Sequence, residues 1–242
     1  MPAEKVHLSF LKYVLGVHKK ATNIAVRGEL GAFPIGIKAL HSSYKYYERL
    51  MVTESESLLK QALIMAKVIT TQRSWWTAVT QHIPTQSADK ESTYRSSWID
   101  RLGKSDKLRT LRLFKSSFHF EQYLTHVYNI YHRKSLTRLR ISCHTLNIEV
   151  GRYSNLPVED RTCKHCIQPI EDELHFVATC QLYDDARASL YSKIGEFCQN
   201  FHALDDNSKL IYLCNAEGPI IREFAKFCNS CFETRKEYYS KN

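Results

Sequence analysis

Four residues with the spacing Cys-x2-Cys-x8-His-x4-Cys constrain the fold more than any other feature of this chain: Cys163, Cys166, His175 and Cys180. Two cysteines separated by two residues can direct both sulfur atoms toward one point, and a nearby His and Cys can complete a tetrahedron around zinc. Four protein ligands leave no open position for water or substrate. The sequence therefore predicts one structural Zn²⁺ rather than a catalytic metal.

Two other interpretations of this cluster stay open from the sequence. The cysteines could be buried thiols that lie near an unrelated His and Cys, because free Cys often packs as a small hydrophobic residue. His165, between the first two cysteines, could also replace His175 as a ligand.

Most of the remaining chain has the periodicity of helices. Apolar residues recur at three- and four-residue steps over 37–51, 58–69, 94–102, 108–114, 182–197 and 220–232. Pro34 and the pair Gly218-Pro219 are suited to helix starts, and Thr53 with Glu56 forms a capping box that predicts a helix start near 54. The predicted fold is mostly α, with helical bundle segments and a small zinc-clasped knuckle that can include a short β-hairpin.

The organisation of the chain is predicted from its composition. The polar stretch 81–92, which contains Pro84, is the best linker candidate. We expect an N-terminal helical region at 1–84, a basic helical region at 85–150, a zinc-binding module at 151–185 and C-terminal helices at 186–242. A length of 242 residues with 43% apolar composition can bury the core of one or two domains.

The expected location is intracellular, nuclear or cytoplasmic. The first thirty residues lack the apolar core and cleavage site of a signal peptide, so the eight cysteines are expected to stay reduced. The sequence has no run of eighteen apolar residues, so no membrane contact is expected.

Positive charge is concentrated before the cysteine cluster. Residues 61–150 carry fourteen Lys and Arg against six Asp and Glu, whereas residues 151–242 carry eleven against fourteen. The densest group of cations comprises Arg133, Lys134, Arg138 and Arg140. Apolar residues between them suggest a helix with charge on one side, so we expect phosphate contacts here. A solvated helical surface would have the same composition.

Other motifs favour structural roles. Glu171, Asp172 and Glu173 lie between the zinc ligands, and three thiolates with one imidazole give the bound site a charge of about −1, so phosphate is expected to be repelled there. The Tyr183-Asp184-Asp185 run suits a helix start. Cys228 and Cys231 lie on an apolar helical stripe, so core packing is expected for both. His144 has no partner at a metal-ligand spacing, so it is expected to be a polar surface residue or a hydrogen-bonded core residue.

Three runs resemble the C-terminal zinc-binding region of reverse-transcriptase polyproteins from non-LTR retrotransposons of invertebrates: LTRLRISCHTLNIEVGRY at 136–153, PVEDRTCKHC at 157–166 and EDELHFVATCQLY at 171–183. Residues 10–34 and 107–115 also look like the segment that follows the polymerase domain in those proteins. The resemblance spans about residues 6–185. It implies the same four metal ligands and a role in holding template RNA or target DNA.

The chain departs from that family where catalysis is concerned. The sequence lacks the aromatic-x-Asp-Asp turn and further Asp of a polymerase palm, and it has no phosphate-cradling glycine motif or nucleophile elbow. The resemblance implies the tail of such a polyprotein. Because the chain begins within a family-like segment, Met1 is either a natural start or a truncation point. We therefore expect a non-enzymatic module that takes no small-molecule substrate and binds RNA or DNA weakly. The alternative is a protein-interaction module with a structural zinc.

Overall fold

The computed structural model describes residues 2–68, 76–77 and 87–241, and helices account for most of them. The α-helices are α1 (Pro2–Leu15), α2 (Asn23–Glu29), α3 (Ile35–Val52), α4 (Leu58–Val68), α6 (Ser87–Gly103), α7 (Leu111–Phe114), α8 (Tyr123–His126), α9 (Ile130–Arg140), α10 (Asn147–Tyr153), α11 (Asp184–Gly195), α12 (Asp206–Asn215) and α13 (Gly218–Lys241). Within these residues, β-pairing is limited to two isolated bridges, Leu30 with Phe120 and Thr162 with Ile170. The predicted mostly α fold is confirmed.

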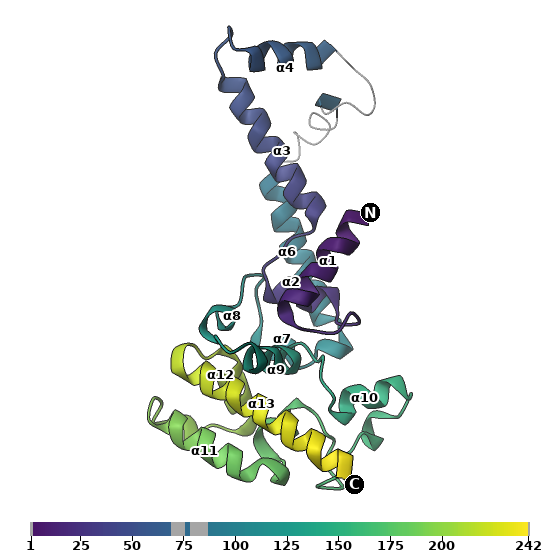
Figure 1. Cartoon of the computed structure of the whole chain (residues 1–242), viewed down its shortest axis with the longest axis vertical. Coiled ribbons are helices and arrows are strands. Elements are labelled where there is room, and N and C mark those ends of the chain that lie inside the picture. The colour runs from purple at the N-terminus through teal and green to yellow at the C-terminus, as the bar shows by residue number, and fades with distance from the viewer. Residues whose placement is uncertain (1, 69–75, 78–86, 242) are drawn as a thin grey trace.

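An arm of helices projects from a larger helical body (Figure 1). α3 and α6 pack side by side along the arm, and α4 follows α3 at its outer end. At the base of the arm, Trp98 on α6 is fully buried and donates a hydrogen bond of 2.8 Å to the carbonyl of Ile24. Gly28 on α2 lies against the Trp98 ring so closely that a Cβ atom would come within 2.4 Å of it. Trp98 thus joins the arm to the body.

The longest helix, α13, organises the body by packing against α8, α9, α11 and α12. Its buried face includes Phe224, Phe227, Cys228 and Cys231, as the apolar stripe in the sequence predicted. Buried apolar residues from all four predicted regions join one continuous core. The boundaries of those regions stay predictions, and the one between residues 84 and 85 lies outside the described residues.

One local prediction was wrong, and another lies partly outside the described residues. Thr53 does not start a helix but ends α3, where its hydroxyl donates to the carbonyl of Arg49, and α4 begins five residues later at Leu58. Residues 81–86 of the proposed linker lie outside the described residues. Residues 87–92, the rest of it, form the start of α6. Helix formation there depends on the downstream stripe around Trp98, which buries against α2, rather than on the polar composition of the segment itself.

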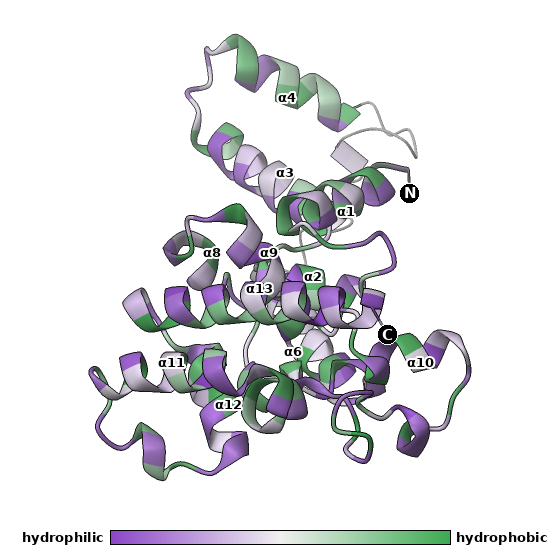
Figure 2. Cartoon of the chain, turned by 60° about the horizontal axis from the view of Figure 1, so that its bottom comes forward, coloured by the Kyte–Doolittle hydropathy of each residue, from purple (hydrophilic) through white to green (hydrophobic). Residues whose placement is uncertain are grey.

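The length and hydrophobicity of the described helices show whether one of them could span a membrane. Among them, none combines the length and the apolar character needed to cross a bilayer. Figure 2 shows hydrophobic residues along much of the outer helix α4, whereas hydrophobic and hydrophilic residues alternate along the helices of the body.

Candidate metal centre and basic cavity

The four predicted ligands come together in the structure. One donor atom from each of Cys163, Cys166, His175 and Cys180 lies within 4.8 Å of the other three. The Cys180 sulfur is 3.9 Å from the sulfurs of both Cys163 and Cys166. His165 lies apart from this group, because its ring packs against Tyr238 with centroids 5.2 Å apart. The cluster is an arrangement of three thiols and one imidazole that could hold a metal ion.

The backbone brings the first two ligands together in a tight knuckle. The amide of Cys163 donates to the carbonyl of Pro169 at 2.8 Å, and the amide of Ile167 donates back to the carbonyl of Cys163 at 2.7 Å. The bridge between Thr162 and Ile170 closes the base of the knuckle. The predicted β-hairpin is therefore reduced to one bridge.

A π-helical turn over His175–Thr179 positions the other two ligands. In a regular α-helix, side chains five residues apart diverge by about 140°. The π-turn instead pairs residues five apart, and the amide of Cys180 donates to the carbonyl of His175 at 2.8 Å. The His-x4-Cys spacing therefore depends on a non-α turn, which lets both side chains reach one point.

The two ring nitrogens of His175 have different surroundings. Nδ1 lies 2.9 Å from the hydroxyl of Thr179, whereas Nε2 is buried without a hydrogen-bond partner. A buried nitrogen without a partner is costly unless a ligand satisfies it. With Nδ1–H donating to Thr179, Nε2 keeps a lone pair that could bind a metal.

Burial also sets the protonation of the ligands. It raises the pKa of the Cys163 and Cys180 thiols and lowers the pKa of His175. The imidazole is thus neutral and ready to coordinate, whereas the thiols must lose protons when a metal binds.

Two glutamates from the ligand loop anchor the knuckle to the body. Glu171 is buried and accepts two hydrogen bonds of 2.7 Å from Arg235 on α13 and one of 3.0 Å from Tyr239. It also accepts a hydrogen bond of 2.7 Å from the amide of Asn147, at the start of α10. The loop between the ligands is therefore fixed to α10 and α13.

Glu173 makes the second anchor. It is fully buried and accepts hydrogen bonds from Arg109 at 2.7 Å and Ser142 at 2.8 Å, with His144 at 2.9 Å. Although burial opposes its charge, His144 and Arg109 hold the pKa of Glu173 far below its usual value. Of the two structural roles expected for His144, surface residue or hydrogen-bonded core residue, the structure shows the second. Glu171 and Glu173 thus point inward and pair with arginines, so they do not contribute to the repulsion of phosphate that the sequence predicted.

The backbone conformation of Ile167, in the knuckle, predicts that a substitution there can stabilise the protein. Its φ is +69°, a left-handed conformation that costs a β-branched residue about 1–2 kcal/mol, and its side chain is 74% exposed. Asn tolerates this conformation better, so Ile167→Asn is expected to increase the free energy of unfolding by about 1 kcal/mol. Thermal or urea unfolding with metal present measures the change.

Ile64 on α4 is a matched control, because it is 53% exposed and lies in regular helix. Ile64→Asn should give no gain, since Asn is a weaker helix former. Equal effects of the two substitutions would contradict the proposed backbone strain at Ile167.

The four predicted phosphate contacts on α9 do not share one surface. Arg138 is exposed, and the half-buried Lys134 lies one turn before it. Arg138 donates through Nε and Nη2 to the carbonyl of Gly16, at the C-terminal end of α1. Arg133 turns away and donates to the carbonyl of Val127 at 3.1 Å. Only Lys134 and Arg138 are therefore brought together near the surface.

Arg140 is a core residue, which corrects its predicted contact with phosphate. It is fully buried, donates to Glu29 at 2.9 and 3.2 Å and to Glu121 at 2.6 Å, and also bonds the carbonyl of Cys214. Its guanidinium lies 4.5 Å from the ring centre of Phe114. Although burial acts against the charge, Glu29 and Glu121 raise the pKa of Arg140. No surface remains through which Arg140 could reach a ligand.

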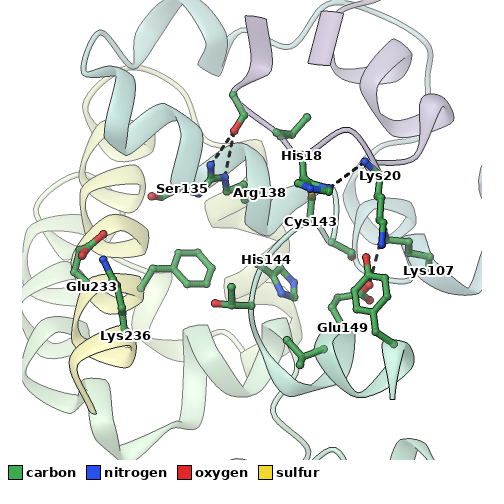
Figure 3. Close-up of a pocket in the computed structure, with 17 residues that line it drawn as sticks. His18, Lys20, Lys107, Ser135, Arg138, Cys143, His144, Glu149, Glu233 and Lys236 are labelled. Atoms are coloured by element: carbon green, nitrogen blue, oxygen red, sulfur yellow. Dashed lines mark hydrogen bonds and ion pairs between the residues drawn. The ribbon is translucent and has the colours of Figure 1, made fainter. Parts of the chain in front are cut away.

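A cavity of about 660 Å³, which we call the basic cavity, is lined by other cations and not by Arg140. Its charged lining consists of four cations, Lys20, Lys107, Arg138 and Lys236, and two carboxylates, Glu149 and Glu233. Figure 3 shows Lys20 and Lys107 on one side of the cavity and Lys236 on the opposite side. The sequence reasoning missed Lys20, Lys107 and Lys236, because no spacing relates residues from such distant segments.

Comparisons with known proteins do not assign a function to the cysteine cluster or to the basic cavity. No protein-family model, curated protein or solved structure matches the chain. The resemblance to retrotransposon polyproteins stays a prediction.

Proposed function

We propose that this chain is a non-catalytic, zinc-stabilised module of retroelement origin that binds RNA or DNA weakly, without sequence preference, through the phosphate backbone. Four cations from four separate segments converge on the basic cavity, and this convergence carries the proposal. Phosphate contacts of this kind supply most of the affinity of non-specific nucleic-acid binding.

Zinc is the metal that suits the four ligands best. With Zn–S bonds of about 2.3 Å, the sulfurs of a tetrahedral site lie about 3.8 Å apart, close to the 3.9 Å separations of Cys180 from Cys163 and Cys166. Thiolate and imidazole ligands favour zinc among the common divalent ions. Bound there, zinc would hold the knuckle against the π-turn, and with four protein ligands it would have a structural role.

The charges of the basic cavity favour an anionic ligand. Within the described residues, Lys20, Arg138 and Lys236 have no carboxylate partner. The carboxylate of Glu149 is held by Arg109 at 2.8 Å and also pairs with Lys107 at 4.0 Å. Arg138 still has Nη1 free of hydrogen bonds to the described residues, so it can cap α1 and contact a phosphate together. The result is an excess of available positive charge on one concave surface.

Salt dependence tests this proposal. Affinity for a short DNA or RNA duplex, measured by fluorescence anisotropy, should fall steeply between about 50 and 200 mM salt. Arg138→Ala should weaken binding to different sequences equally and reduce the slope of log K against log salt by about 1, because one phosphate contact is lost. Lys20→Ala should behave in the same way.

Lys45 on α3 provides the matched control. It is exposed on the arm, away from the basic cavity, and Lys45→Ala removes the same charge. It should leave the affinity and the slope nearly unchanged. Equal losses in the Lys45 and Arg138 variants would mean that only net charge matters, and binding insensitive to salt would refute phosphate contacts.

A second candidate function is contact with another protein through the arm. Five apolar side chains of α4 are 50–82% exposed: Leu58, Leu59, Ile64, Met65 and Val68. Exposed apolar patches of this kind often mark interaction surfaces. An apolar interface would bury these residues and resist salt, so Leu59→Glu with Met65→Glu would abolish it while leaving nucleic-acid binding intact.

A further inference from the structure

The basic cavity combines its cations with aromatic and apolar surface. Tyr153, at the end of α10, is 65% exposed, and Lys20 lies over its ring with Nζ 5.3 Å from the centroid. Half-buried Phe232 contributes a second ring, which stacks on Phe176 with centroids 4.6 Å apart. A cation and an accessible ring therefore lie within a few ångströms of each other at the cavity wall.

The size of the cavity suits a small organic group rather than a phosphate alone. Ligand sites in proteins commonly enclose about 300–1,000 Å³, and this cavity has about 660 Å³. An inorganic phosphate would use the cations but leave Tyr153 and the apolar wall uncovered. A nucleotide uses both, because its phosphate and its base offer an anion and a flat π surface in one unit.

We propose that the basic cavity receives one nucleotide of a single-stranded nucleic acid, with its base against Tyr153 and its phosphates on Lys20 and Arg138. This inference rests on the proposed function and adds a preference for single strands. A base in a duplex is paired and stacked, so it cannot enter a cavity without being flipped out, whereas a base in a single strand is free to stack on a side chain.

The walls of the cavity are built to hold their shape. Ser142 and His144 line it and are both fixed by the buried Glu173, and Glu149 is fixed by Arg109 at 2.8 Å. Arg138 is held by its two bonds to Gly16, whose φ of +64° turns the chain away from α1. A preformed site of this kind loses little conformational entropy when a ligand binds.

The test compares a 12-nucleotide single strand, oligo(dT) or oligo(U), with a duplex of the same length by fluorescence anisotropy. Tyr153→Ala should weaken binding of the single strand by about 5- to 100-fold and leave duplex binding unchanged. Tyr153→Phe should restore the affinity, because it keeps the ring. Adenosine monophosphate should compete with the single strand far better than inorganic phosphate does.

Tyr128 is the matched control, since it is 79% exposed and does not line the basic cavity. Tyr128→Ala should bind single strands as the unchanged chain does, and circular dichroism should show that both Ala variants are folded. If Tyr153→Ala keeps full affinity for single strands, the inference is overturned, while salt-sensitive duplex binding would leave the proposed function standing. If the unchanged chain binds neither single strands nor duplexes at low salt, both are refuted.

Discussion

Replacing Cys163 by serine is expected to abolish zinc binding and to unfold the knuckle together with its contacts to the body. Structural zinc sites contribute on the order of 10 kcal/mol to folding of their ligand segments, so this is the largest effect expected from a single substitution here. His175→Ala should have the same result, because Nε2 is the nitrogen available to a metal. Metal analysis of the purified protein should find about one zinc per chain, and none in either variant.

The loss should extend beyond the knuckle. Glu171 and Glu173 tie the ligand loop to Arg235 on α13 and to Arg109 beside α7. When the loop opens, Arg235 and Arg109 each lose a buried carboxylate partner, which weakens the packing of the helices around them. The helical signal in circular dichroism should therefore fall as a chelator is added. Acid should also release the metal, since protons compete with it for the thiolates.

Cys198→Ser is the control for this experiment. Cys198 is a half-buried thiol that does not belong to the cluster, and its substitution should leave zinc content unchanged. His165→Ala should also keep the zinc, because His165 contacts Tyr238 instead. Zinc retained in the absence of Cys163 and His175 would refute this site.

The second large effect concerns Arg140. Arg140→Ala should lower the free energy of unfolding by about 3–5 kcal/mol, because removing one partner of a buried ion pair leaves uncompensated charge in the core. Glu29 is fully buried and would lose both of its bonds from the guanidinium. Urea unfolding measures the loss, which is a large part of the 5–15 kcal/mol by which a typical domain is stable.

Arg138→Ala on the same helix is the matched control. Arg138 is exposed and bonds one carbonyl, so its loss should cost about 1 kcal/mol. Arg140→Lys should lie between the two, because one ammonium cannot reproduce the forked contacts to Glu29 and Glu121. Equal unfolding midpoints for the Arg138 and Arg140 variants would contradict a stabilising role of the buried ion group.

The two arginines also separate stability from binding. Arg138→Ala should weaken nucleic-acid binding in a protein that remains folded. Arg140→Ala should affect binding only as far as it unfolds the chain, because its side chain has no access to solvent. This contrast makes the surface assignment testable with two substitutions on one helix.

Much of the structure follows from the sequence alone. The spacing of Cys163, Cys166, His175 and Cys180 predicted that their side chains converge, and the structure brings their donor atoms together in a group that could hold a metal ion. Apolar periodicity placed α3, α6, α11 and α13, and the Asp184-Asp185 pair correctly indicated the start of α11. These features depend on residues close together in the chain, so local pattern is sufficient to predict them.

Other features were decided by residues far apart in the chain. Arg138 and Arg140 have the same chemistry and lie two positions apart, yet only the packing of α9 against α13 and the segments carrying Glu29 and Glu121 determines which of them is buried. In the same way, Lys20, Lys107 and Lys236 become neighbours only when the chain folds. The sequence by itself determined the cluster of three Cys and one His and most of the helices, whereas tertiary packing decided which charges neutralise one another in the core and which remain available to a ligand.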